Sequence, residues 1–180
     1  MPLKKLGSIF LILLTFFSCT PQLNVSSDYD KVVDFNIYKT FSWAKEQESP
    51  RNGNPMFDND LNRKRVKEAI EKEMGSLGLS RFDWAPDLLI DFHITIDQKT
   101  DTMAHDNYPF GFRYWPDYGV YSYTYKKGAI IIHFVDSKKE QLVWQGVGSR
   151  TLSDVPSENM EERIQNVVKK ILAQYPTYKK

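Results

Sequence analysis

Two histidines and an aspartate are the residues whose types and spacing best suit metal or acid–base chemistry. Asp91 and His93 alternate on the polar side of the apolar run Asp87–Asp97, and His133 lies in a second apolar run, Ala129–Val135. If these runs are antiparallel strands, the three side chains meet on one face, where they can ligate Zn²⁺ or serve a hydrolase. The helical spacing of a zinc protease, two His at i and i+4 with a Glu, is absent from the sequence. We therefore expect partly exposed histidines on a sheet face, and no metal or other cofactor.

The single cysteine, Cys19, is placed for a different chemistry. Met1–Lys5 is short and basic, and Leu6–Phe17 is a twelve-residue apolar run typical of a signal peptide. A helix of that length reaches about 18 Å, short of the ~30 Å core of a bilayer. The run ends at Cys19 in a pattern that resembles the lipobox of bacterial lipoproteins, although Phe17 is bulkier than the residue usual there. We expect Cys19 to be lipidated; the alternative is an ordinary cleavage site followed by a free or buried thiol.

The N-terminal segments also predict where the protein lies in the cell. We expect residues 1–18 to be a lipoprotein signal peptide and residues 19–24 to be the lipidated cysteine with a short tether. Thr20, and not an aspartate, follows the cysteine, which by resemblance to general lipoprotein sorting favours the outer membrane. We expect a protein anchored in the outer membrane through Cys19 and facing the periplasm.

An aromatic-rich segment is a second candidate binding region. Tyr108–Tyr125 holds nine aromatic residues in eighteen, interrupted by Pro and Gly. Such rings can stack on sugars or anchor a protein partner, with Tyr108, Trp115 and Tyr118 as candidate ligand-binding residues. The segment can instead fold back as a lid over the sheet, which we favour because large exposed apolar patches are rare. Both interpretations stay open.

The composition predicts one globular domain over residues 25–180. The chain has 180 residues, 24 Lys+Arg, 23 Asp+Glu and 41% hydrophobic residues, which argues against a disordered chain and against a nucleic-acid binder. With one cysteine, an intramolecular disulfide is impossible.

The strand and helix patterns position these candidates. Apolar runs on either side of Asp136–Glu140 predict a hairpin in which Phe134 faces Leu142 and Ile132 faces Trp144 on the core side. The opposite side of the hairpin would carry the pairs His133–Val143 and Ile131–Gln145. Further alternating runs predict strands at Val25–Tyr29, Tyr38–Ala44, Asp87–Asp97 and Tyr121–Tyr125.

Two amphipathic helices complete the predicted fold. The first has Asp58 or Asn59 as its N-cap and closes at Gly78; the second follows Ser157 as N-cap and ends before Pro176. Their expected apolar sides are Leu61, Val66, Ala69, Ile70, Met74 and Leu77 in the first, and Met160, Ile164, Val167, Val168, Ile171, Leu172 and Tyr175 in the second. We expect an α+β two-layer sandwich, a mostly antiparallel sheet of four to six strands with both helices packed on one face.

Four ordered segments carry a resemblance to a known family. They are Asp28–Trp43, Ala85–Ile94, Gly128–Gly146 and Lys169–Pro176. Together they resemble a family of bacterial lipoproteins with a small domain of unknown function. The matching points are Tyr29-Asp30, Phe35, Tyr38, Thr40, Trp43, Pro86-Asp87, Gly128, Asp136, Trp144, Gly146 and Tyr175-Pro176. The resemblance implies structural roles for these residues and brings no activity, cofactor or catalytic residue.

The predicted function follows from the anchor. The sequence has no nucleophile elbow, no Ser-His-Asp signature and no Gly-rich phosphate loop. We expect a non-enzymatic binding or structural module of the cell envelope, whose partners are the membrane through Cys19 and an envelope protein or glycan. The alternatives are a glycan, peptidoglycan or small-ligand binder that uses residues 108–125, and a metal-dependent hydrolase at His93 and His133.

Overall fold

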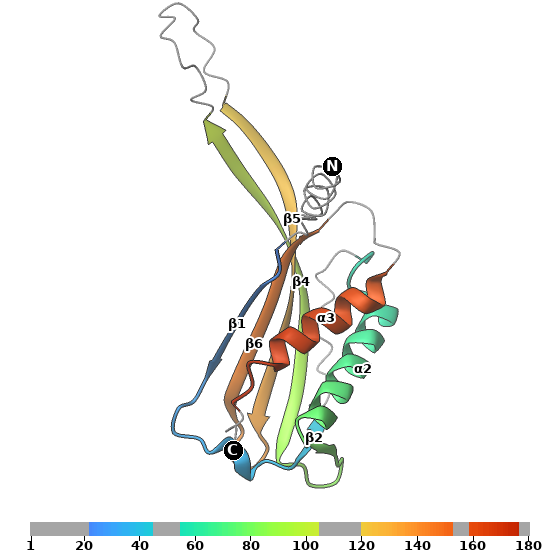
Figure 1. The fold of residues 1–180 in the computed structure, drawn as a ribbon, viewed down its shortest axis with the longest axis vertical. Helices are drawn as coiled ribbons and strands as arrows, with labels where there is room; N and C mark the ends of the chain where they lie inside the picture. The colour runs from blue at the N-terminus through green and yellow to red at the C-terminus, as the bar shows by residue number, and fades with distance from the viewer. Residues whose placement is uncertain (1–21, 45–54, 105–119, 153–158, 177–180) are drawn as a thin grey trace, which may run out of the picture.

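The fold is a six-stranded mixed sheet with two helices, which confirms the α+β class. The computed structural model describes residues 22–44, 55–104, 120–152 and 159–176. Figure 1 shows α2 and α3 side by side over one face of the sheet. The elements are β1 (Asn24–Tyr29), the 3-10 helix η1 (Phe35–Ile37), β2 (Thr40–Trp43), α2 (Asp60–Ser76), β3 (Ser80–Arg81), β4 (Leu88–Ala104), β5 (Val120–Asp136), β6 (Gln141–Leu152) and α3 (Met160–Leu172). Among the described residues, no helix is both long and apolar enough to cross a membrane.

The strand order is β1-β6-β5-β4-β2-β3, and the pairing is mixed. The neighbours β1, β6, β5 and β4 are antiparallel, whereas β2 pairs in parallel with both β4 and β3. Parallel neighbours need a crossover connection, and α2 lies in the chain between β2 and β4. The antiparallel pairing that the sequence predicts is therefore found for β1, β6, β5 and β4, and the parallel pairing of β2 makes the sheet mixed.

The predicted register of the β5–β6 hairpin is wrong. Phe134 pairs with Trp144 and Ile132 with Gly146, because Val143 is an extra residue between the pairs Phe134–Trp144 and Val135–Leu142. The turn is also one residue shorter than expected, with Asp136 paired to Gln141 at the end of the strands. The bulge leaves Leu142 51% exposed and buries Val143 and Trp144 completely or nearly so.

The core lies between this face of the sheet and the two helices. Phe134 and Trp144 stack with ring centroids 4.7 Å apart, and Tyr175 contacts both rings. The predicted apolar stripe is buried from Ile164 to Tyr175, whereas Met160 is only partly buried; the helix begins after Asn159, and Ser157 lies outside the described residues. The first helix is N-capped by Asn59 and followed by Gly78 at φ +82, as the sequence predicts. Leu61, expected on the buried side, is 57% exposed.

Glycines let α3 approach the sheet closely. Gly146 and Gly148 alternate with Gln145 and Val147 along β6, so both glycines face the helix. A Cβ at Gly148 would lie 2.8 Å from Val167 Cγ1, and one at Gly146 would lie 2.5 Å from Ile171 Cγ2. The helix therefore packs against bare backbone at this point.

The strands β4 and β5 are each 17 residues long and extend beyond the other strands. They pair along their whole length, from Leu88–Asp136 to Ala104–Val120. Because β6 pairs with β5 only as far as Lys126, the rest of β4 and β5 forms a two-stranded ribbon that projects from the sheet (Figure 1). The predicted strand Tyr121–Tyr125 is thus the outer part of β5.

Candidate functional site

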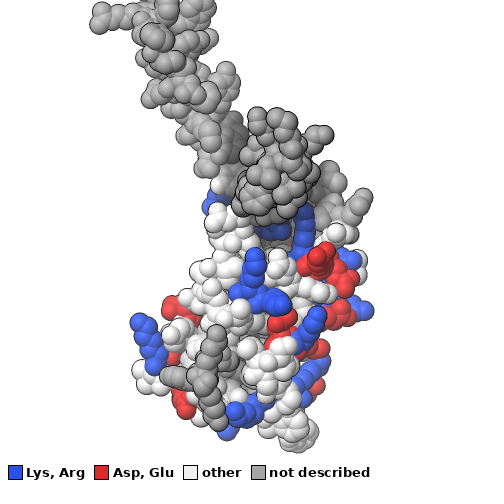
Figure 2. All heavy atoms as spheres, viewed as in Figure 1, with Lys and Arg blue, Asp and Glu red and all other residues white. Residues whose placement is uncertain are grey.

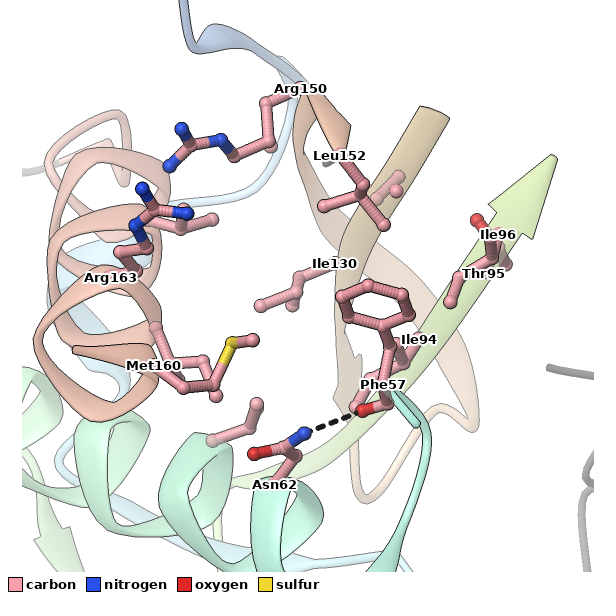
Figure 3. Close-up of a pocket in the computed structure, with 16 residues that line it drawn as sticks. Phe57, Asn62, Ile94, Thr95, Ile96, Ile130, Arg150, Leu152, Met160 and Arg163 are labelled. Atoms are coloured by element: carbon pink, nitrogen blue, oxygen red, sulfur yellow. Dashed lines mark hydrogen bonds between the residues drawn. The ribbon is translucent and has the colours of Figure 1, made fainter. Parts of the chain in front are cut away.

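An apolar pocket lies between the helices and the sheet, at the end of the domain where β1 begins. Its volume is about 710 Å³, part of which is open solvent. Figure 3 shows Phe57, Ile94, Ile130, Leu152 and Met160 around the cavity. Further lining residues are Asn62, Val66, Thr95, Ile96, Gly128, Ala129, Gly148, Arg150, Arg163, Ile164 and Val167. A concave, mostly apolar site with a few polar groups is the usual form of a ligand pocket.

The polar groups of this pocket are mainly two arginines. Arg150, on β6, and Arg163, on α3, lie on the same side of the cavity in Figure 3. The Nε atom of Arg150 is buried and has no hydrogen-bond partner within the described part of the chain. Burial, and secondly the charge of Arg163, lowers the pKa of the Arg150 guanidinium. Two neighbouring cations beside apolar walls therefore have charge available for an anion.

A hydrogen-bonded asparagine holds one wall of the pocket. Asn62, in the first turn of α2, is 4% exposed, and its Nδ2 donates to the Phe57 carbonyl at 2.9 Å. Its Oδ1 accepts from Arg65 at 2.9 Å. The first bond ties the segment before α2 to the first turn of the helix, and Phe57, which is 8% exposed, lines the cavity.

The sequence analysis missed this pocket, although signals for it were present. Arg150 continues the helix-facing alternation Trp144, Gly146, Gly148 along β6, and a charged residue on a core-facing side needs an explanation. Arg163 stands three residues after Met160, within the apolar stripe of α3. What the sequence could not supply is that these two arginines meet, because they lie on different elements.

The predicted histidine site comes together on the opposite side of β4 and β5. The inferred antiparallel pairing of these strands is confirmed, with Asp91 opposite His133. The ligand atoms of Asp91, His93 and His133 all lie within 4.8 Å of one another. His93 Nε2 is 2.9 Å from Asp91 Oδ2, and the two imidazole rings are 5.4 Å apart.

The donors of this histidine face already have protein partners. Asp91 pairs with His93, and His133 Nε2 lies 3.1 Å from Gln145 Oε1. Burial lowers the pKa of His133, against a smaller opposing effect of the Gln145 hydrogen bond. The three residues can offer ligands to a divalent cation, but with side chains 35% and 47% exposed at His93 and Asp91 they also suit a solvated polar surface.

Two carboxylates at the other end of the sheet, Asp136, which is buried, and Asp87, which is partly buried, are hydrogen-bonded to the chain around η1 and β2. Tyr38 donates to Asp136 Oδ2 at 2.9 Å, and Asp136 Oδ1 accepts from the Lys138 and Lys139 amides. Asp87 accepts from the amides of Lys39 and Thr40 and from the Thr40 hydroxyl. These bonds tie η1 and β2 to the ends of β4 and β5. These two carboxylates therefore serve the fold.

The other predicted site residues lie outside the described residues. They are Cys19, the proposed lipidation site, and the aromatic residues Tyr108, Trp115 and Tyr118. The aromatic segment joins Ala104 to Val120, which are paired at the far end of the ribbon. Neither the lid nor the binding interpretation of this segment is tested by the geometry.

One of the solved structures that match this chain shares its fold. A PDZ domain protein from Parabacteroides distasonis matches 98% of this chain with a TM-score of 0.55 at 20% identity. The present chain spans 41% of that protein. Two crystal structures of a PelC dodecamer from Paraburkholderia phytofirmans match 84% of this chain and 95% and 96% of theirs, with TM-scores of 0.42 and 0.43 at 10% and 11% identity.

The remaining two comparisons concern sequence. No curated protein matches the chain. A family model, described as a domain of unknown function (DUF4136), matches residues 25–177. That match covers all the strands and both helices described above except the first residue of β1. The chain therefore belongs to the DUF4136 family.

Proposed function

We propose that the protein is a lipid-anchored, non-enzymatic binding module of the cell envelope, whose ligand site is the pocket between the helices and the sheet. The observation that carries this proposal is the pocket itself, which has apolar walls and two arginines without an ion pair to any described carboxylate. The pocket lining contains no cysteine, serine, histidine or carboxylate, and Thr95 supplies its one hydroxyl; this lining suits binding better than acid–base catalysis.

The position of the pocket relative to the anchor supports the proposal. Asn24, the first residue of β1, pairs with Ser149, the neighbour of Arg150. Cys19 precedes Asn24 by five residues, a distance of at most about 18 Å in extended chain. A lipid on Cys19 would hold this end of the domain close to the membrane surface, in the outer membrane and facing the periplasm. The pocket would then lie on the membrane-proximal end.

The surface charge argues against a nucleic-acid partner. Figure 2 shows Lys and Arg interspersed with Asp and Glu over the helices. Exposed pairs such as Lys64–Glu68 and Arg81–Glu71 are of opposite sign. Nucleic-acid binding needs a basic stripe or patch, which this face lacks.

Membrane fractionation of a Cys19→Ala variant tests the anchor. We expect the wild-type protein to sediment with outer membranes and to stay there after a high-salt wash, because acyl chains hold it and charges do not. The variant should move to the soluble fraction, and Cys19→Ser should behave alike. Retention of either variant in the washed membrane pellet would show that the anchor is elsewhere.

A further inference from the structure

We propose that the pocket binds a long-chain carboxylate such as a fatty acid, with its acyl chain between the helices and the sheet and its carboxylate between Arg150 and Arg163. This inference rests on the proposed function and names the ligand class of the same site. Nothing in the family description assigns it.

The walls of the pocket fit an unbranched chain. Ile94 and Ile130 come from the sheet, and Met160 and Val167 come from α3. Ile94, Ile130 and Met160 are only partly buried by the protein, so apolar surface remains for a ligand to cover. Each methylene group that enters such a site strengthens binding about fourfold.

The arginines fit a carboxylate at the end of that chain. A guanidinium binds a carboxylate through two parallel hydrogen bonds, and the buried Arg150 Nε has a donor without a partner among the described residues. Arg163 lies beside Arg150 on the same side of the cavity (Figure 3), and its charge adds to the effect of burial in lowering the pKa of Arg150. An anion between the two groups removes that repulsion. A neutral lipid leaves it in place.

The size and position of the pocket favour one chain over two. The enclosed cavity is about 90 Å³, and about 710 Å³ is reached only when open solvent is included. A phospholipid has two acyl chains and a bulky headgroup. A fatty acid has one acyl chain, which matches the apolar walls, and one carboxylate, which matches the two arginines. The pocket also lies at the β1 end, where the tether to Cys19 begins, and so beside a membrane that supplies such acids.

Calorimetric titration with dodecanoate tests the inference on the full chain carrying Cys19→Ala, which has no acceptor for its own lipid. We expect saturable binding at one site. Arg163→Gln and Arg150→Gln should each weaken it about tenfold or more, because each removes a charge-assisted hydrogen bond. Lys170→Gln is the matched control, since it removes the same charge from an exposed position of the same helix, and its affinity should stay within about twofold.

The ligand series separates the head from the chain. We expect 1-dodecanol to bind about tenfold or more weakly than dodecanoate, and butyrate to show no binding. The inference would be overturned if 1-dodecanol bound as tightly as dodecanoate. It would also be overturned if both arginine variants bound dodecanoate as tightly as the wild-type protein. Binding of inorganic phosphate or of phosphatidylglycerol vesicles without binding of dodecanoate would overturn it as well. Arg163 is exposed, so its variant decides the matter even where Arg150→Gln fails to fold.

The two proposals fail separately. Absence of dodecanoate binding together with release of Cys19→Ala from membranes rejects the ligand and keeps the anchor. Dodecanoate binding by a chain that stays in the washed membrane pellet rejects the anchor and keeps the ligand. Recovery of wild-type protein that binds dodecanoate only after its own acyl chains are removed would show that the occupant is the Cys19 lipid, which overturns the free-acid assignment.

Discussion

The two faces of the sheet are built from the same strands, but their polar groups differ in how far they are buried. On the face that α2 and α3 cover, Asp136 is 5% exposed and hydrogen-bonded, and the Arg150 Nε is buried without a partner. On the opposite face, His93 Nε2 and Asp91 Oδ2 lie 2.9 Å apart, with the Asp91 and His93 side chains 47% and 35% exposed. Desolvation raises the cost of an unmet polar group, so an unpaired group on the covered face is a better pointer to a ligand than a convergent cluster on the open one.

The largest difference between the faces should appear at two adjacent residues of β6. Trp144→Ala should lower the free energy of unfolding by about 3–5 kcal/mol, since it empties a fully buried site between Phe134 and Tyr175. Gln145→Ala on the other face should cost at most about 1 kcal/mol, for its hydrogen bond to His133. Chemical denaturation of both variants measures the contrast, and equal losses would mean that the faces are assigned wrongly.

A smaller, pH-dependent difference should separate two aspartates. Burial raises the pKa of Asp136, but bonds from the Lys139 amide, the Tyr38 hydroxyl and the Lys138 amide outweigh it and hold the pKa below its usual 3.8. The unfolded state then binds the proton more tightly, so Asp136 stabilises the fold above pH ~4 and loses this effect as the pH falls through its folded value.

The test compares Asp136→Asn with Asp91→Asn by urea denaturation between pH 7 and pH 3. At pH 7 we expect Asp136→Asn to cost about 1–3 kcal/mol, and the gap to wild type to close toward pH 3. Asp91→Asn should cost about 0.5 kcal/mol or less, because the contact between Asp91 and His93 is partly exposed to solvent. A gap for Asp136→Asn that does not change with pH would exclude the carboxylate as its cause.

The smallest effect is expected from zinc on the histidine face. Micromolar Zn²⁺ should leave the melting temperature unchanged, since Asp91 and His133 are engaged with His93 and Gln145 and three partly exposed ligands hold a metal weakly. Thermal unfolding with and without Zn²⁺ measures this. A saturable rise that is lost in His93→Ala and again in His133→Ala would make the open face a metal site and reverse the comparison of the faces.

Local patterns predicted most of the elements correctly. Asn59 and Gly78 bound the first helix because capping is decided within one turn of the chain. The stripe Ile164, Val167, Val168 and Ile171 is buried because its 3.6-residue period needs no partner to be recognised. The meeting of Asp91, His93 and His133 on one face also followed, since alternation places them on the same side of two antiparallel strands.

Errors arose where neighbours in space override the local pattern. The turn one residue shorter than predicted and the bulge at Val143 together shift the hairpin by two residues, which brings Trp144 and not Leu142 opposite Phe134 and leaves Leu142 exposed. The cause of the bulge is tertiary, because the Trp144 ring fits against Tyr175 of the C-terminal segment. Leu61 is apolar and at helical spacing, but it lies near the N-terminal end of α2, where it is left exposed.

What the sequence by itself determined is the α+β class, both helices, the strands of the hairpin and the convergence of the histidine face, together with the expectation of a lipid on Cys19. Only the tertiary structure decided the pocket and its two arginines. Arg150 and Arg163 belong to different elements, and they become neighbours because Gly146 and Gly148 let α3 lie against the backbone of β6. Periodicity describes one element at a time, whereas a cavity is a property of how two elements pack.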